Sequence, residues 1–456
     1  MQSTNAKVLA HTDNDRDKGH LRPLPTGNER LYAMHDGKVH NPLGAGSYIY
    51  KKEYIASHIR YLGLPTRNAP PGQALPPSIL FIHIGAQPNN SPHAGTITVF
   101  ILAFLIAREI KRYYEVPAGS EDGVSVELQT WINDFQVVVQ LDLVDTAPHN
   151  EEGCTYEGIQ YQRSQRFTKA HHGLLPDYEE VMCTAAAFVG GEIRYVVRNQ
   201  ETLTSLPSMP VIIDAMIRDR ERLGLELAPE TGGLAMRRAC PHEGCGLAEK
   251  HGRKNKYSFA PSGAAVIEFH CPEHGYHSVM TSEHREVATL EFNTPLRNLV
   301  RAFAYGIDTA RSRAAAFSKE SGGEAERVRV HMRVTGADYT GTYSDQLLWR
   351  QLMLMSMTEP VFKGIAPPVI AYAPLIQDWA GSKLSKSLYV ENGAYEYLKE
   401  RGMGYMVSFA EMKRQGRDQR ILYREVETWV EDPKKLFRPY SIDYLHRVFE
   451  EEKGKE

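Results

Sequence analysis

Residues 79–114 are the part of this chain that most constrains its fold. Residues 79–84 (ILFIHI) form a largely apolar run between Pro77 and Gly85, which is typical of a buried strand in a parallel sheet. Residues 96–114 follow after a short loop and have the composition of a helix that is apolar in its first half and basic at its end. A strand that leads through a loop into a helix predicts an α/β fold, with the loop at the carboxyl edge of the sheet.

The loop between strand and helix contains residues 88–95 (PNNSPHAG) and is suited to phosphate. It places His93 and Gly95 at the start of the helix, where free N–H groups and the helix dipole favour negative charge. Gly95 has no Cβ, so we expect a nucleotide to approach the backbone closely there. No GxGxxG motif follows the strand, which argues against a dinucleotide-binding oxidoreductase.

A second informative segment, residues 383–387 (KLSKS), lies far downstream. It supplies two lysines and two hydroxyls in five residues, shortly after Gly381 and a predicted strand at residues 367–373. Such a loop is suited to closing over a triphosphate and neutralising the charge that develops in a transition state.

Together the two segments resemble the HIGH and KMSKS motifs of class I aminoacyl-tRNA synthetases. The chain is most similar to class I (archaeal-type) lysyl-tRNA synthetases with a shortened C-terminal region, because residues 85–95 have the spacing of that family's first motif and residues 369–383 resemble the approach to its second. Thr96 stands in place of the last HIGH histidine, and Leu384 in place of the usual Met. The resemblance implies an adenylate-forming ligase that uses ATP and Mg²⁺, with lysine as the first candidate substrate and tRNA as the acceptor.

Candidate site residues follow from the motifs and the resemblance. The expected catalytic residues are His93, Lys383 and Lys386. The expected ATP site adds Gly336 and Asp338, from a GAD segment after a predicted strand at 328–335, and comprises Pro92, His93, Gly95, Thr96, Gly336, Asp338, Lys383, Ser385, Lys386 and Ser387. The expected substrate contacts are Gln87, Asn89 and Asp134. We place Asp134 at the end of a predicted strand (124–133), facing the substrate's amino group; the alternative for Asp134 and Asp338 is a helix cap or turn.

Two turns about 25 residues apart carry metal-ligand spacing. Cys240 and Cys245 lie in CPHEGC, and Cys271 and His274 lie in CPEH, each with the shape of a zinc-ribbon knuckle. These four residues form a closed Cys₃His set, so we predict a structural Zn²⁺. The neighbouring histidines leave the fourth ligand open, and the alternative for the whole set is buried free thiols; those histidines are His242, His270 and His277. The resemblance likewise implies a zinc-binding insertion.

These observations predict a Rossmann-type (HUP-like) parallel sheet that is split by a helical insertion containing the zinc ribbon. The expected divisions are an N-terminal extension (1–77), a first half of the catalytic domain (78–145), the insertion (146–294, with the ribbon at 240–277), a second half (295–387) and a short helical C-terminal region (388–456). Further expected helices cover residues 48–64, 178–189, 211–223, 295–313 and 344–355.

Composition limits the remaining choices. A net charge of −3 over 456 residues provides no global basic field, so tRNA would need a local patch. The five cysteines are an odd number, the polar N-terminus lacks a secretory signal, and no apolar run is long enough to span a bilayer, so we expect a cytoplasmic protein without a disulfide framework.

The acceptor stays open at this point. Only 69 residues follow Ser387, whereas a synthetase that reads an anticodon normally carries a larger domain there. We therefore expect tRNA to bind weakly and through its acceptor end. One alternative is a synthetase-like amide or ester ligase that uses a small amine or peptide, and another is an inactive paralog that acts as a binding module.

Overall fold

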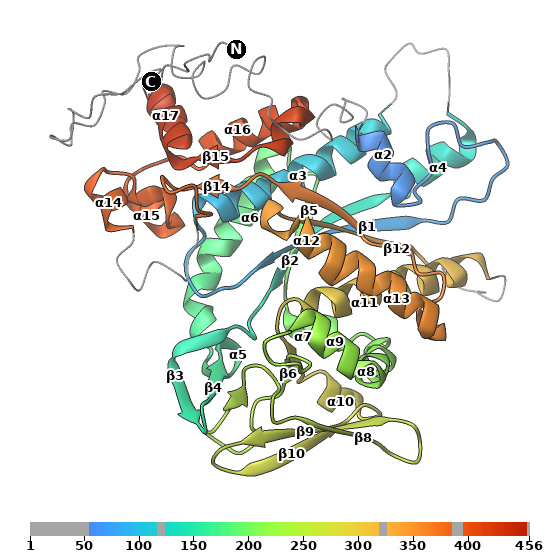
Figure 1. The fold of residues 1–456 in the computed structure, drawn as a ribbon. Helices are drawn as coiled ribbons and strands as arrows, with labels where there is room; N and C mark the ends of the chain where they lie inside the picture. Colours follow the sequence, from blue (N-terminus) through green and yellow to red (C-terminus); the bar gives the residue numbers. More distant parts are fainter. Residues whose placement is uncertain (1–53, 116–123, 319–325, 385–394, 454–456) are drawn as a thin grey trace, which may run out of the picture. The chain divides into compact units, whose positions relative to one another are not determined.

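The computed structural model describes residues 54–115, 124–318, 326–384 and 395–453. The chain divides into two units, residues 1–41 and 42–456, and all described residues belong to the second. At the centre of that unit is a parallel sheet of five strands in the order β13-β12-β1-β2-β5 (Figure 1). They are β1 (Ser78–Ala86), β2 (Gln136–Leu143), β5 (Arg194–Asn199), β12 (Val328–Gly336) and β13 (Val369–Ala373). The expected α/β class with a parallel central sheet is confirmed.

The strand order locates the crevice of the sheet. From β1 the chain builds outward through β2 to β5, and later it returns on the other side of β1 with β12 and then β13. Since ligands in open α/β sheets bind at the carboxyl ends of the strands where this direction reverses, the expected crevice lies beyond β1 and β12.

The two faces of the sheet differ in polarity. Helix α3 (Ala94–Tyr113) covers one face, where Leu80 and Ile82 of β1 are fully buried. Helix α11 (Leu296–Phe317) covers the other, with the sheet between the two helices in Figure 1. On that second face, Arg329 and His331 of β12 contact the Asp308 carboxylate of α11 at 2.9 and 3.0 Å. The α11 face therefore holds charged and titratable groups, whereas Leu80 and Ile82 give the α3 face an apolar centre.

The predicted strand at 124–133 was wrong. Residues Val126–Asp134 form helix α4, and β2 begins only at Gln136. The Ser125 hydroxyl accepts from the Leu128 amide at 3.2 Å as an N-cap, and the buried Leu128 and Trp131 are three residues apart, which is helical spacing. Strand β5 was missed inside the predicted insertion, although it pairs with β2. Only the middle of its sequence (RYVVRN) is apolar, so its signal was short.

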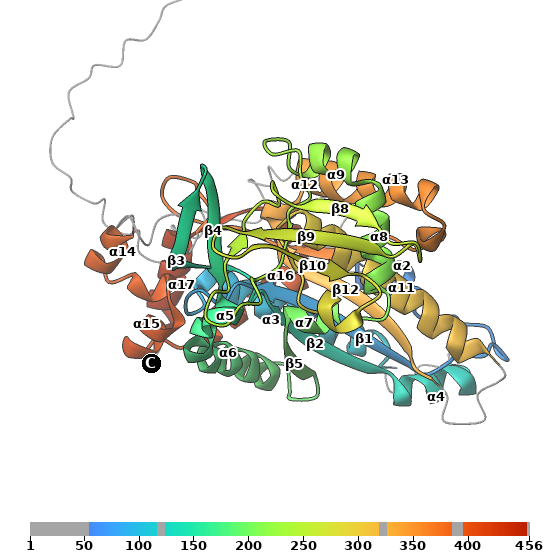
Figure 2. The ribbon, with the colours of Figure 1, turned by 90° about the horizontal axis from the view of Figure 1, so that it is seen from below.

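The segment between β2 and α11 contains small sheets and helices. Two antiparallel sheets, β3-β4-β7 and β10-β9-β8, carry the cysteine turns, and Figure 2 shows β8, β9 and β10 side by side. Their strands are β3 (Pro148–Tyr156), β4 (Ile159–Ser164), β7 (Ala248–Glu249), β8 (Lys256–Phe259), β9 (Ala265–Cys271) and β10 (Gly275–Met280), and a two-stranded pair joins β6 (Met236–Arg237) to β11 (Glu291–Phe292). The helices are α5 (Gln165–Thr168), α6 (Leu175–Phe188), α7 (Gln200–Thr204), α8 (Met209–Arg218), α9 (Arg220–Leu227) and α10 (His284–Val287).

The remaining elements flank the sheet. Helix α2 (Tyr54–Tyr61) lies within the predicted helix 48–64, of which residues 48–53 are outside the described part. The predicted helix 344–355 is found as α12 (Thr342–Ser344), a π-helical turn (Asp345–Trp349) and α13 (Arg350–Thr358). The C-terminal region is helical, and β14 (Ile376–Gln377) pairs with its strand β15 (Tyr440–Ser441). Its helices are α14 (Glu396–Glu400), α15 (Phe409–Arg414), α16 (Arg420–Glu431) and α17 (Ile442–Lys453). None of the described helices combines the length and apolar character that crossing a membrane requires.

Candidate active site and metal centre

His93 begins helix α3 at the carboxyl end of β1. Its backbone is extended and its Nδ1 accepts a hydrogen bond from the Thr96 amide at 3.2 Å, so the side chain caps the helix. The first turn of α3 holds no acidic residue, which leaves the positive end of the helix dipole uncompensated. This cap fixes the imidazole of His93 beside the cavity described below.

Gly95 makes room for that imidazole. A Cβ on Gly95 would lie 3.0 Å from His93 Cε1 and 3.1 Å from His93 Nδ1. We expected Gly95 to allow a nucleotide to approach the backbone. In the structure the ring of His93 lies against Gly95 instead, and the Cβ of Ile376 would lie 3.6 Å from an added Cβ. The glycine therefore allows the capping geometry.

The β1–α3 loop is held by two distant segments. From α6, the Tyr178 hydroxyl donates to the carbonyls of Gln87 (3.1 Å) and Asn90 (3.0 Å). From α15, the Phe409 amide donates to the Pro92 carbonyl at 2.6 Å and the Ala410 amide to Ser91 Oγ at 3.0 Å. The C-terminal region thus positions the first motif, and Pro92 contributes a structural carbonyl.

Across the crevice, the end of β12 meets the start of KLSKS. Lys383 Nζ donates to Asp338 Oδ2 at 2.5 Å, and the two side chains are 44% and 28% exposed. A Cβ on Gly336 would collide with Asp338 Oδ1, so this glycine gives the carboxylate its place. Leu384 is buried and its amide donates to the Ile376 carbonyl at 2.8 Å, which anchors the beginning of the loop. Ser385, Lys386 and Ser387 lie outside the described residues.

These groups line one cavity of about 300 Å³ at the carboxyl edge of the sheet. Of the residues predicted from the sequence, those on its wall are Gln87, Asn89, His93, Gly95, Thr96, Gly336, Asp338 and Lys383. Pro92 is not among the lining residues. The structure thus brings the β1–α3 loop, the first two residues of KLSKS and the GAD segment to a single place.

The placement of Asp134 was wrong. It is the last residue of α4, one residue before the buried Phe135, and its carboxylate pairs with Arg327. It therefore lies at the amino-terminal end of β2, whereas the cavity lies at the carboxyl ends of the strands. The error follows from reading the helix before β2 as the strand itself.

Sequence reasoning missed the cationic part of the wall. Arg297, Asn298 and Arg301 come from the first turns of α11, and Arg333 comes from β12. Helix α11 was predicted as a basic amphipathic helix, and a basic helix is usually solvated on its charged face. The available signal was the spacing of Arg297 and Arg301, which places both on one face.

A buried polar layer supports these arginines on the α11 face of the sheet. The Asp142 carboxylate of β2 contacts His83 Nδ1 at 3.1 Å, Gln140 Nε2 at 2.7 Å and Arg301 Nε at 3.9 Å. Burial opposes ionisation of Asp142, but His83, Arg301 and Gln140 outweigh it and lower the pKa to about 2. Next to it, burial lowers the pKa of His331 to about 4, despite the hydrogen bond to Asp308. Asp142 is therefore an anion and His331 a neutral base at pH 7.

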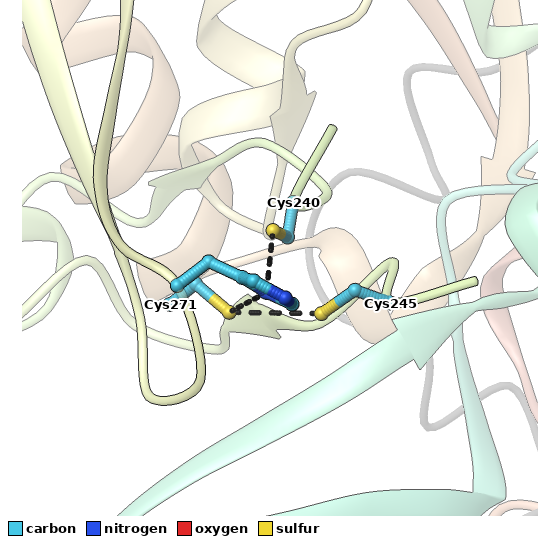
Figure 3. A group of neighbouring side chains, drawn as sticks. Cys240, Cys245 and Cys271 are labelled. Atoms are coloured by element: carbon cyan, nitrogen blue, oxygen red, sulfur yellow. Dashed lines mark hydrogen bonds between the residues drawn. The ribbon is translucent and has the colours of Figure 1, made fainter. Parts of the chain in front are cut away.

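The cysteine turns form a compact donor cluster (Figure 3), which we call the metal knuckle: Cys240, Cys245, Cys271 and His274. Cys240 Sγ lies 3.5 Å from His274 Nδ1, Cys245 Sγ lies 3.6 Å from Cys271 Sγ, and Cys271 Sγ lies 3.6 Å from His274 Nδ1. A tetrahedral zinc with bonds of about 2.3 Å to sulfur and about 2.0 Å to nitrogen holds its ligand atoms roughly 3.5–3.8 Å apart. The donor set fits Zn²⁺, with all four positions taken by protein.

The surroundings of the metal knuckle select its fourth member. Among the described residues the imidazole of the donor cluster is His274, and none of His242, His270 and His277 belongs to it. His242 instead stacks on His274, with ring centroids 4.1 Å apart, and His270 hydrogen-bonds the Tyr161 hydroxyl at 2.8 Å. The Arg163 Nε donates to the Cys245 carbonyl at 2.6 Å and fixes the first turn. Burial raises the pKa of the Cys245 thiol to about 12. Buried thiols in this state gain from a cation that stabilises the thiolate.

No protein-family model matches this chain, and no curated protein matches it. Solved structures similar to it include the Thermus thermophilus arginyl-tRNA synthetase, at 13% identity, over 87% of this chain and 64% of that one, with a TM-score of 0.27. They also include glutamate-tRNA ligases of Elizabethkingia meningosepticum CCUG26117 (12% identity, 69% and 53% of the two chains, TM-score 0.25) and Elizabethkingia anophelis (11%, 68% and 52%, 0.24). This chain spans less than two thirds of each. All three are named as tRNA synthetases or ligases, but TM-scores this low decide nothing about ligands.

Proposed function

We propose that this protein activates a carboxylic acid with ATP, forming an acyl-adenylate and pyrophosphate, and then transfers the acyl group to an acceptor. The observation that carries the proposal is the single cavity that gathers His93, Asp338 and Lys383 from three separate parts of the chain. It lies where the strand order reverses, with the positive end of α3 on its wall.

In the proposed reaction a carboxylate oxygen of the substrate attacks the α-phosphorus of ATP. A new P–O bond forms, the bond from the α-phosphorus to the oxygen bridging to the β-phosphate breaks, and pyrophosphate leaves with that electron pair. In this proposal His93 and Lys383 stabilise the negative charge, and the amides of α3 add partial positive charge. By the resemblance, Lys386, Ser385 and Ser387 would complete the loop over the phosphates, and Mg²⁺ would neutralise phosphate charge.

The pair between Lys383 and Asp338 is part of this proposal. By the resemblance Asp338 holds the ATP ribose, and in the structure its carboxylate is occupied by Lys383. Nucleotide binding would then separate the pair, giving Asp338 to the ribose and Lys383 to the phosphates. The Lys383 ammonium is thereby kept beside the cavity before ATP arrives.

ATP–pyrophosphate exchange with a panel of amino acids tests the function. Exchange that requires one amino acid and is lost in His93→Ala would support adenylate formation. If no acid of the panel supports exchange, the alternative of an inactive paralog that acts as a binding module would be favoured. Lysine, which the resemblance names, is one member of the panel.

The acceptor is proposed as the 3′ end of tRNA, with a small amine or peptide as the second candidate. The tRNA should bind with a log K that falls with log salt, because each neutralised phosphate releases counterions. Equal salt slopes for full-length tRNA and an acceptor minihelix would indicate acceptor-end binding. Transfer to an amine but not to tRNA would favour the amide ligase. We further propose that the metal knuckle holds one structural Zn²⁺ and that the protein acts in a reducing cytoplasm.

A further inference from the structure

Three guanidinium groups converge on the inner wall of the cavity. Arg297 and Arg301 lie one turn apart on α11, and Arg333 projects from the same face of β12 as His331. Arg297 and Arg301 are only 7% and 6% exposed. Buried arginines are rare unless a carboxylate or phosphate faces them, because the charged group has lost its water.

The protein supplies little counter-charge to this arginine cluster. Within the described residues, the Arg297 guanidinium donates only to the Thr294 hydroxyl (2.7 Å) and the Phe292 carbonyl (3.4 Å), and its Nε is buried without a partner. Arg333 donates to the Thr335 hydroxyl at 3.4 Å and lies 5.2 Å from the Tyr339 ring. Burial, followed by repulsion from Arg301, lowers the pKa of Arg297 to about 10, and the same two causes lower the pKa of Arg333.

The carboxylates near the cluster already have partners. Asp142 accepts from His83, Gln140 and the Tyr305 hydroxyl (3.4 Å), and it lies beside a single arginine of the three. Asp338 pairs with Lys383. The described wall therefore offers no unpaired carboxylate to the ammonium of a lysine side chain, whereas it offers three cations to an anion.

The arginine cluster is set apart from the groups that face ATP in the proposed function. Arg301 and Arg333 also line a second cavity of about 140 Å³, whose wall includes His83, Tyr305 and His331 and none of the α3 or KLSKS residues. His93 and Lys383 line the first cavity and do not line this second one. Arg301 and Arg333 thus border the inner end of the site, on the α11 side, and Arg297 lines the first cavity one helical turn before Arg301.

One acceptor complements the three donors. Asn89 Oδ1 is buried without a hydrogen-bond partner in the described structure, and Asn89 lines the cavity. A buried acceptor of this kind gains from a positively charged donor such as an α-ammonium group. The cavity therefore combines a place for one ammonium with a place for an anion.

We propose that the acid activated at this site is an amino acid with a second anionic group, such as a side-chain carboxylate, and that Arg297, Arg301 and Arg333 bind that group. The inference rests on the proposed adenylate-forming function. It replaces lysine, which the resemblance named, by a dicarboxylic amino acid. Guanidinium groups bind carboxylates through paired, charge-assisted hydrogen bonds, which neutral isosteres do not form.

The first experiment measures ATP–pyrophosphate exchange of the full chain with matched acids. Aspartate, glutamate and 2-aminoadipate are compared with asparagine, glutamine and lysine. We expect one dicarboxylic acid to exceed its amide by roughly 10²-fold or more in kcat/KM, because the amide leaves buried guanidiniums unpaired. Exchange that is fastest with lysine or with a neutral acid would overturn the inference while leaving adenylate formation intact.

The second experiment separates the acid from the triphosphate as the bound anion. Arg333→Gln should raise the KM for the acid roughly 30-fold or more and leave the KM for ATP within about 2-fold. Arg350→Gln, an exposed arginine of α13 outside the cavity, serves as the matched control and should change neither. A rise confined to the KM for ATP would assign the cluster to the triphosphate and overturn the inference.

A third measurement keeps the inference testable if no exchange is detected. Thermal unfolding of the wild type is followed with glutamate, glutarate or glutamine added alone. Stabilisation by the dicarboxylates and not by glutamine, lost in Arg333→Gln and kept in Arg350→Gln, would support the anion site even where the adenylation proposal fails. No stabilisation by any dicarboxylate, together with no exchange, would overturn both.

Discussion

At the metal knuckle, three thiols and an imidazole from two turns lie within 4.8 Å of one another, with three of the pairs at 3.5–3.6 Å, which is close enough for one cation to bind all of them. At the cavity, three arginines from α11 and β12 face a space with little opposing charge. Both groups join distant parts of the chain and both are largely buried. We propose that a structural ion binds the donors of the metal knuckle and that a substrate balances the excess positive charge of the cavity. Removing a member should therefore affect stability in opposite directions at the two places.

Loss of a metal ligand is expected to have the largest effect. Cys271→Ser should reduce zinc from about one ion per chain to a small fraction, because a closed site depends on all four ligands. Structural zinc contributes on the order of 10 kcal/mol to folding of the segment that holds it, so the mutant should melt at a clearly lower temperature. Elemental analysis and calorimetry measure both.

Cys183→Ser is the control for this substitution, since Cys183 is an exposed thiol outside the cluster. It should retain both zinc and stability. Full stability of Cys271→Ser would show that the metal knuckle is only a group of buried thiols that binds no structural ion.

The second effect concerns Lys383, which we propose acts in catalysis. Lys383→Ala should lower kcat for adenylation by about 10²–10³-fold, because an electrostatic donor of this kind contributes roughly 3–4 kcal/mol in the transition state. Its stability should change little, since the pair with Asp338 is partly exposed. Pyrophosphate exchange measures kcat, and a melting curve measures the stability of the variant. An unchanged kcat would remove Lys383 from the proposed chemistry.

Acid should destabilise the polar layer on the α11 side of the sheet. The folded pKa of His331, about 4, lies below its unfolded value of 6.5, so the unfolded chain binds the extra proton first. The contribution of His331 is complete above pH 6.5 and is lost as the pH falls toward 4, with an upper size of about 3 kcal/mol. The pKa of Asp142 is about 2 in the folded protein and 3.8 in the unfolded chain, so the free energy of unfolding falls further below pH 3.8.

Denaturant unfolding from pH 7 to 4 measures this slope, and His331→Asn is the comparison because it removes the imidazole. The mutant should show a shallower loss of unfolding free energy between pH 6.5 and 4. Parallel curves for the two proteins would show that the burial of His331 does not control acid stability.

The smallest expected effect has the opposite sign to that of the metal knuckle. Arg297→Met should raise the free energy of unfolding of the ligand-free protein by about 1–2 kcal/mol, because an uncompensated buried charge is replaced by an apolar side chain of similar length. It should also abolish discrimination between the dicarboxylic acid and its amide. Arg350→Met, at an exposed position, is the stability control. A large drop in melting temperature for Arg297→Met, without a drop for Arg350→Met, would mean that other groups of the protein already balance the charge of the Arg297 guanidinium.

The sequence by itself determined the features that depend on neighbouring residues. The strand and helix around His93 could be predicted because apolar runs and capping residues act locally, and β12 and α11 were found for the same reason. The metal knuckle could be predicted as well, since two short turns fix the spacing of its cysteines and His274. Where the local signal was short or mixed, the prediction failed: a capped helix before β2 was taken for a strand, which misplaced Asp134.

Only the tertiary structure decided which distant groups meet. It placed β5 in the sheet, Lys383 against Asp338, and α15 against the loop that precedes His93. It also gathered the arginines, whose charges in the sequence are no different from those of solvated residues. Whether a buried charge is compensated depends on every group within a few ångströms, and these groups come from strands and helices far apart in the chain. For that reason the residues that we propose bind ATP could be predicted from their motifs, whereas the cluster of positive charge at the inner end of the cavity was found only from the fold.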